Sequence, residues 1–158
     1  MLPQHWEAVK TIYEDGIATS NATFQTEAPT WKEWDTSHLP HCRIVAFSNN
    51  EMAGWAAISP VSSRCVYSGV GEVSVYVSGT HRHQGVGKLL LKELIAQSEQ
   101  NGLWTLQSGI FPENINSIKL HEGFGFRQIG YREKIGKMGN VWRDNIFMER
   151  RSSIVGVD

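Results

Sequence analysis

Cysteine, net charge and long apolar runs are all scarce in this chain. Its 158 residues include two cysteines, Cys42 and Cys65, which are too few for the disulfide framework of many small secreted proteins. A formal net charge of −1 provides no basic field for binding nucleic acid or an anionic membrane. No apolar run approaches the roughly 18 residues that a membrane span needs. We therefore expect a cytoplasmic protein that binds neither nucleic acid nor a membrane.

The chain is long enough to bury the core of one domain. Helical and strand periodicities alternate along it, which predicts an α/β (α+β) fold with a mixed, mostly antiparallel sheet and helices on both faces. The expected domain spans residues 1–150, and residues 151–158 form a flexible tail. Helices are expected at 4–19, 30–38, 85–100 and 116–123, and strands at 43–48, 52–59, 72–77, 103–110, 126–137 and 141–150. The buried stripe of the third helix is predicted to be Val86, Leu89, Leu90, Leu94 and Ile95.

A positively charged, glycine-rich turn joins the strand at 72–77 to the helix at 85–100. Its residues are Arg82-His83-Gln84-Gly85-Val86-Gly87-Lys88. The two glycines leave no side chain over the turn, so that several backbone N–H groups and the start of the helix dipole can face one anion. This arrangement is typical of a pyrophosphate site, although an ordinary strand-to-helix turn is the alternative.

Two common nucleotide loops do not match this turn. The dinucleotide fingerprint needs a third glycine where this chain has Leu90, and a Walker-type loop needs Ser or Thr where it has Leu89. What remains is Arg-x-x-Gly-x-Gly, which resembles the acetyl-CoA loop of the GCN5-related N-acetyltransferase (GNAT) superfamily. Residues 114–126 (NINSIKLHEGFGF) resemble the second cofactor element of that superfamily, with a polar helix start and a Gly-Phe pair before a strand.

One branch of that superfamily is similar along nearly the whole chain, namely the phosphinothricin and methionine sulfoximine N-acetyltransferases. The similar segments are Phe24-Gln25-Thr26-Glu27, Pro60, Arg64, Tyr67, residues 72–78 (EVSVYVS), Leu120-His121-Glu122 and residues 139–144 (GNVWRD). The chain departs from the family at two places. A strand that usually precedes the first helix is missing or very short here, and Val141 is an extra residue before Trp142.

The resemblance implies an acetyl-CoA-dependent enzyme that acetylates the α-amino group of a small amino acid, such as L-phosphinothricin, L-methionine sulfoximine or methionine sulfone. It also implies a homodimer and a role in detoxification, which would give herbicide or antibiotic resistance. Glu72 would take the proton of the ammonium group, and His121 would donate or shuttle a proton. A solvated carboxylate and a satisfied core histidine are the structural alternatives for these two residues.

The resemblance also assigns the binding residues. Those expected at acetyl-CoA are Val75, Tyr76, Val77, Arg82, His83, Gln84, Gly85, Val86, Gly87, Lys88, Asn114, Asn116, Ser117 and Lys119. Those expected at the acceptor are Phe24, Thr26, Arg64, Tyr67, Glu72 and Trp142. Among them Arg64 would hold the substrate carboxylate, because a guanidinium group binds a carboxylate through two hydrogen bonds. An exposed loop charge is the alternative for Arg64.

Two other functions remain open. The acceptor could be a peptide or protein N-terminus or a polyamine, and the chain could be an acetyl-CoA-binding sensor without catalysis. His41-Cys42 and His81-Arg82-His83 lack the spacing of a metal site, so no metal is expected.

Overall fold

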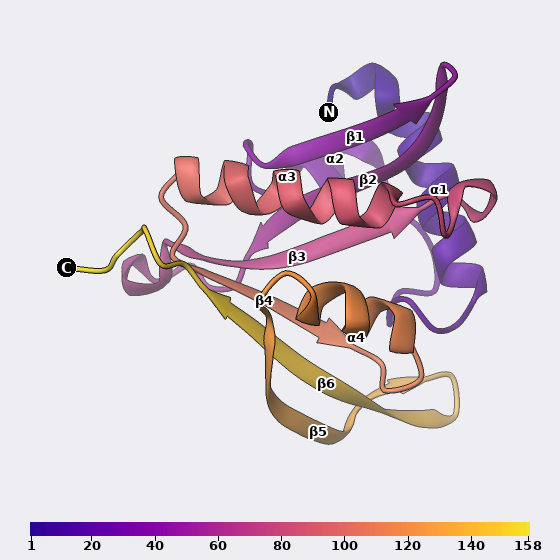
Figure 1. Ribbon diagram of the computed structural model, residues 1–158. Coiled ribbons are helices and arrows are strands. Elements are labelled where there is room, and N and C mark those ends of the chain that lie inside the picture. Colours follow the sequence, from indigo (N-terminus) through magenta and orange to yellow (C-terminus); the bar gives the residue numbers. More distant parts are fainter.

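The computed structural model describes all residues, 1–158, and contains one six-stranded sheet with helices on both faces (Figure 1). The α-helices are α1 (Trp6–Ala18), α2 (Trp31–Ser37), α3 (Val86–Gln100) and α4 (Ile115–Glu122). The strands are β1 (Arg43–Ser48), β2 (Glu51–Pro60), β3 (Val70–Val77), β4 (Thr105–Ile110), β5 (Arg127–Met138) and β6 (Val141–Arg151). Short 3₁₀ turns are η1 (Pro3–His5), η2 (Cys65–Tyr67) and η3 (Gly79–His81). No strand precedes α1.

The predicted fold class is confirmed. Every α-helix and strand begins and ends within two residues of its expected range. The ends are set by local chemistry. Thr30, for example, caps α2 by accepting a hydrogen bond from the backbone N–H of Glu33, whose carboxylate accepts one from the N–H of Thr30 at 2.8 Å. None of the helices is both long enough and apolar enough to cross a membrane.

The strands lie in the order β1-β2-β3-β4-β6-β5, and every neighbouring pair is antiparallel except β3 and β4. The parallel pair is short. It joins Val70 to Thr105, Gly71 to Leu106 and Glu72 to Gln107, after which the strands diverge (Figure 1). The rest of β3, up to Val77, therefore has backbone groups on its β4 side that no neighbouring strand engages.

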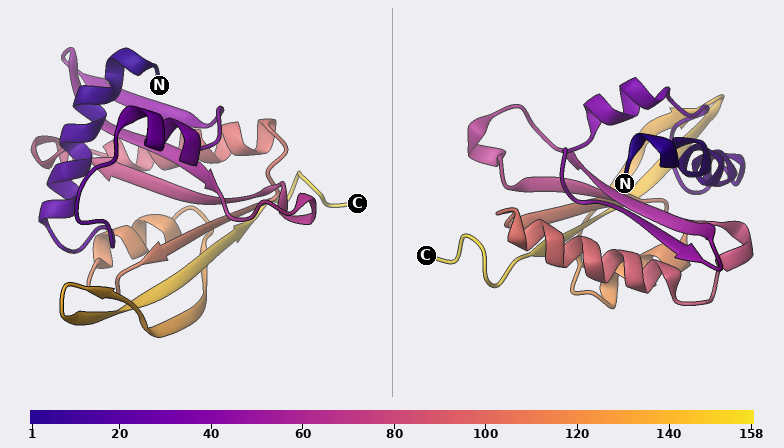
Figure 2. Two further views of the ribbon diagram at one scale, coloured as in Figure 1. Left: turned by 180° about the vertical axis from the view of Figure 1, so that it is seen from behind. Right: turned by 90° about the horizontal axis from the view of Figure 1, so that it is seen from above.

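Two apolar cores fill the space between the sheet and its helices, α1 and α2 on one face and α3 on the other (Figure 2). Side chains of β2 point alternately to the two faces of the sheet and so contribute to both cores. Trp55 and Ala57 belong to the core under α1 and α2, whereas Ala56 and Ile58 belong to the core under α3. The sheet is thus buried on both sides at its centre, which holds β3 rigidly in place.

The buried stripe of α3 differs from the prediction at one position. Leu89 is 62% exposed, whereas Leu91, which was not included, is fully buried with Leu90, Leu94 and Ile95. Three consecutive leucines make the helical period ambiguous, and the sheet contact decides which of them faces inward.

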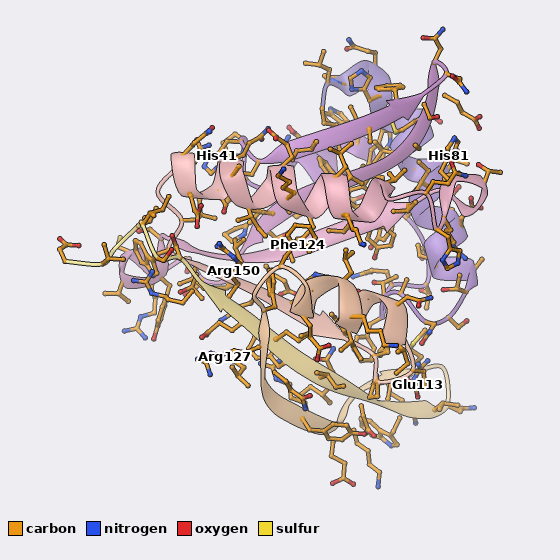
Figure 3. All side chains as sticks on the ribbon, in the orientation of Figure 1. His41, His81, Glu113, Phe124, Arg127 and Arg150 are labelled. Carbon is orange, nitrogen blue, oxygen red and sulfur yellow. The ribbon has the colours of Figure 1, made fainter.

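Two arginines at the end of β6 attach this strand to its surroundings. Arg150 forms an ion pair with Glu99 of α3 at 2.9 Å and donates a hydrogen bond to the carbonyl oxygen of Phe124 (Figure 3). Arg151 donates hydrogen bonds to the carbonyl oxygens of Val155 and Gly156 beyond the strand.

The leucine pair on α3 provides a matched stability test. We expect Leu91→Ala to lower the free energy of unfolding by about 2–5 kcal/mol, because it removes buried methyl groups and leaves a cavity. Leu89→Ala should change it by less than about 0.5 kcal/mol, because Leu89 is exposed and alanine suits a helix equally well. Urea unfolding of both variants measures the difference. Equal shifts of the two midpoints would contradict the orientation of α3.

Candidate active site

Two adjoining cavities open where β3 and β4 diverge. The first, which we call the loop groove, has a volume of about 900 Å³ and lies between the glycine-rich turn, α1 and α4. The second, the central cavity, has a volume of about 380 Å³ and lies over β3, β4, β5 and β6. They share the walls Ala22, Val75, Tyr76, Asn114 and Ser117. A molecule in the groove can therefore reach the cavity between β3 and the start of α4.

The glycine-rich turn provides the anion-binding end of the loop groove. Gly85 caps the start of α3 with φ +85°, and a Cβ added there would meet no atom within 4 Å. The first N–H groups of α3 lack partners within the helix and so remain available to an anion. The cationic side chains of Arg82, Lys88 and Lys119 also line the groove. This end is thus positive and sterically open.

The predicted cofactor residues gather at this groove with one exception. Gln84 does not line it, because its side-chain amide donates a hydrogen bond to the carbonyl oxygen of Thr80 at 2.9 Å. Asn114 also has a structural role. It caps α4 by accepting a hydrogen bond from Ser117 N–H, and it donates one to the carbonyl oxygen of Asn21 at 3.1 Å. The assigned cofactor roles of all these residues stay predictions.

The predicted acceptor residues divide into two groups. Phe24 and Glu72 line the central cavity, together with the predicted catalytic residue His121. Thr26, Arg64, Tyr67 and Trp142 line neither cavity. The Arg64 guanidinium lies 5.6 Å from the centre of the exposed Tyr67 ring, and Trp142 is 55% exposed near Lys137. In the single chain these four residues therefore do not contact the space where Glu72 and His121 meet.

Glu72 is the last residue of β3 that pairs with β4, where it lies opposite Gln107. The residue is exposed to solvent. Surrounding protein atoms nevertheless displace enough water to raise the pKa of its carboxyl group, and the positive charge of Arg132 partly opposes that rise. A carboxylate with a raised pKa is suited to accept a proton from a neighbouring amine near neutral pH.

His121 is 3% exposed, and its hydrogen bonds define its tautomer. Nδ1 lies 2.8 Å from the carbonyl oxygen of Ser117, which can only accept, so Nδ1 carries the proton. Nε2 is then a buried lone-pair acceptor without a partner in the protein. Burial lowers the pKa of His121, and the bond to Ser117 partly opposes this. The neutral ring can accept a proton at Nε2.

Loops from distant parts of the chain close over the central cavity. The Phe24 ring packs edge-on against Phe111 at 4.7 Å, and the Arg143 guanidinium lies 4.1 Å from the centre of the Phe111 ring. Arg143 also donates to the carbonyl oxygen of Ser20 at 2.8 Å and to the carboxylate of Glu113 at 3.2 Å. These contacts connect the segment after α1, the loop before α4 and β6 into one roof.

Several lining residues were missed by the sequence prediction. Ser108, Phe111, Arg132, Asn145 and Phe147 all face the central cavity. They lie on or beside β4, β5 and β6, where regular strand patterns give no sign of a cavity. Around this site, no group of three or more His, Cys, Asp or Glu side chains is placed to hold a metal ion.

Comparison with known proteins identifies related chains. The model of the Acetyltransferase (GNAT) family matches residues 6–126. The phosphinothricin N-acetyltransferase of Streptomyces viridochromogenes is 32% identical over 147 residues, which cover 90% of this chain and 80% of that protein. The L-methionine sulfoximine/L-methionine sulfone acetyltransferase of Pseudomonas paraeruginosa is 32% identical over 148 residues, which cover 89% of this chain and 86% of that protein.

The fold has a close counterpart among solved structures. A phosphinothricin acetyltransferase from Sinorhizobium meliloti, solved in complex with AcCoA, matches with a TM-score of 0.89 at 24% identity. The match covers 100% of this chain and 89% of that one. At this identity the likeness supports the fold.

The His121 geometry predicts a specific titration. We expect His121 to titrate below pH 6.5 and to carry its neutral-state proton on Nδ1, because burial disfavours the charged ring. Since the unfolded chain binds this proton more readily, the folded state should lose stability as the pH falls from 6.5 toward the lowered value. Long-range ¹H–¹⁵N NMR of the imidazole rings measures both properties, with His121→Gln providing the assignment. A proton on Nε2 or titration above 6.5 would contradict the structure.

Proposed function

This chain belongs to the acetyltransferase (GNAT) family, and on that basis we propose that it transfers an acetyl group from acetyl-CoA to the α-amino group of a small amino acid. The proposed acceptors are L-phosphinothricin, L-methionine sulfoximine and methionine sulfone, which the names of the two relatives suggest. One observation carries the proposal. A groove with an anion-binding end adjoins a small cavity that contains both Glu72 and His121.

The loop groove fits acetyl-CoA in its chemistry. Pyrophosphate needs clustered N–H donors and positive charge, which the start of α3, Arg82 and Lys88 provide. When bound, acetyl-CoA supplies an acetyl thioester as the acyl donor. The unengaged backbone of β3 at Val75–Val77 would hold the pantetheine amides, and an N–H near Val75 or Tyr76 would stabilise negative charge on the thioester oxygen.

Acetyl transfer requires the amine to lose protons and the departing thiolate to gain one. Glu72 would accept the ammonium proton, directly or through a water molecule, because its raised pKa matches that task. His121 is neutral in the structure and has a free Nε2, so it first accepts a proton from the acceptor side. We therefore assign it the role of a shuttle and not that of a resident acid.

The size of the central cavity favours a small acceptor over a peptide. A volume of about 380 Å³ under the roof of Phe24 and Phe111 holds a free amino acid, whereas a peptide chain would need a groove that continues past these rings. The retained Glu72 and His121 argue against a sensor that only binds acetyl-CoA.

We further propose that the protein is a cytoplasmic homodimer that detoxifies amino-acid inhibitors and so gives resistance to herbicides or antibiotics. The exposed apolar side chains of Ile129 and Tyr131 on the edge strand β5 support a dimer contact, because an edge strand with uncovered apolar side chains favours association. Size-exclusion chromatography with light scattering tests the oligomeric state, and resistance conferred on a sensitive host by expression tests the biological role.

The proposed reaction is tested by thiol release from acetyl-CoA. We expect saturable turnover with L-phosphinothricin, L-methionine sulfoximine or methionine sulfone, and none with spermidine or a short peptide. Glu72→Gln should lower turnover roughly 100-fold or more without changing acetyl-CoA affinity, because it removes the base but not the groove. Turnover with peptide or polyamine alone would overturn the acceptor class. Tight acetyl-CoA binding without turnover on any acceptor would favour the sensor.

The cofactor assignment predicts a difference between two glycines of similar backbone. Gly85 and Gly102 flank α3 with φ of +85° and +78°, and a Cβ at either would meet nothing within 4 Å. Gly85→Asp should weaken acetyl-CoA binding roughly 100-fold, because a carboxylate would face the pyrophosphate. Gly102→Asp imposes similar backbone strain away from the groove and should leave affinity within about twofold. Calorimetry measures both, and equal losses would overturn the loop assignment.

A further inference from the structure

The charged side chains that line the central cavity are one carboxylate and one guanidinium, Glu72 and Arg132. They come from different parts of the sheet, β3 and β5, and they do not form an ion pair with each other. A cavity that carries a negative and a positive group without pairing them is complementary to a zwitterion. A free α-amino acid has this pattern, with an ammonium group and a carboxylate on one carbon.

Arg132 is held in place without using its hydrogen-bond donors. Its guanidinium carbon lies 3.7 Å from the centre of the Phe147 ring on the neighbouring strand β6, which is stacking distance. None of its side-chain nitrogens donates to a protein group, whereas Arg43, Arg143, Arg150 and Arg151 all do. The planar face of Arg132 is thus anchored while its N–H groups remain free for a ligand.

A bulge in β5 brings this arginine to the cavity. Arg132 and Ile135 are three positions apart and would face opposite sides of a regular strand, yet both line the central cavity. The pairing with β6 is irregular between Arg132 and Gly136, and Lys134 has φ +48°. Between these pairs β5 advances by four residues and β6 by two, and the extra residues of the bulge redirect the side chains around it.

Asp144 of β6 holds the bulge in this conformation. Its carboxylate accepts a hydrogen bond from the backbone N–H of Lys134 at 2.7 Å, and another from the hydroxyl group of Tyr131. These bonds satisfy the N–H group that the bulge removes from the ladder. Asp144 therefore acts on the cavity indirectly, by fixing the backbone that directs Arg132.

We propose that Arg132 binds the α-carboxylate of the acceptor amino acid while Glu72 faces its ammonium group, so that this pair selects zwitterionic amino acids over simple amines. The inference rests on the proposed function and deepens it by naming the residue that reads the carboxylate. Guanidinium recognises a carboxylate through two parallel hydrogen bonds, which fixes orientation as well as charge. With the carboxylate held beside Phe147, the amine is directed toward β3.

Arg64 was assigned this task from the sequence, and it does not line the cavity in the single chain. The two assignments give different outcomes for the same kind of substitution. We therefore choose Arg132→Gln and Arg64→Gln as competing variants. Arg127→Gln serves as the matched control, because Arg127 lies on the same strand with its side chain exposed and paired with Glu149 (Figure 3).

The experiment compares L-methionine sulfone with its α-carboxamide, which keeps the amine but lacks the negative charge. We expect Arg132→Gln to lower kcat/KM for the free acid roughly 10- to 100-fold, mainly through KM, because a charged hydrogen-bonded contact is lost. For the carboxamide the change should stay within about twofold. Arg132→Lys should recover part of the activity, and Arg127→Gln should behave like the wild type. Acetyl-CoA affinity and melting temperature of each variant report whether the fold is intact.

Each other outcome overturns the inference and shows which of its assumptions is wrong. If Arg132→Gln lowers activity equally on the acid and the carboxamide, Arg132 has only a structural role. If Arg64→Gln alone shows the selective loss, Arg64 reads the carboxylate, and the proposed reaction still stands. Equal wild-type turnover of acid and carboxamide would mean that no residue reads the carboxylate. Wild-type turnover of neither compound, with polyamine or peptide accepted instead, would remove the inference and the proposed function together.

Discussion

The site depends on the short parallel pairing of β3 with β4. Only the first three residues of β3 pair with β4, and this contact keeps the two halves of the sheet in one layer. Beyond Glu72 the strands separate, which frees backbone groups on β3 and opens the space for both cavities. Apolar cores pack against both faces of β3. The part of β3 after Glu72 therefore stays extended although no strand pairs with it on the β4 side. A longer pairing would close the space in which the proposed chemistry takes place.

The protonation state of each ionisable group in the central cavity depends on its surroundings. Burial raises the pKa of the Glu72 carboxyl group, and the positive charge of Arg132 partly opposes that rise. Glu72 therefore remains able to exchange a proton. His121 is neutral because burial lowers its pKa, and the hydrogen bond to the carbonyl oxygen of Ser117 only partly opposes this. Together with the guanidinium group of Arg132, these two side chains line one small cavity. This separation of roles is the physical basis on which proton acceptance, proton transfer and carboxylate recognition can be assigned to different residues.

Local signals in the sequence predicted the elements and the loop groove well. The glycine-rich turn depends on residues that are adjacent in sequence, so its geometry could be inferred from the chain itself. The error at Leu89 and Leu91 has a different origin, since three consecutive leucines fit a helical stripe in more than one way and the sheet determines the orientation. Arg132 could not be found because its direction depends on a bulge held by Asp144 of the next strand, a contact across strands that no period reveals.

Apart from the residues that they share, the two cavities are lined by different parts of the chain. No residue of β4, β5 or β6 lines the loop groove, whereas those three strands form much of the central cavity. Substitutions in the C-terminal hairpin can therefore change the central cavity without changing any residue that lines the loop groove. The fold thus allows the two cavities to change independently, except at the few residues, such as Val75 and Tyr76 of β3, that line both.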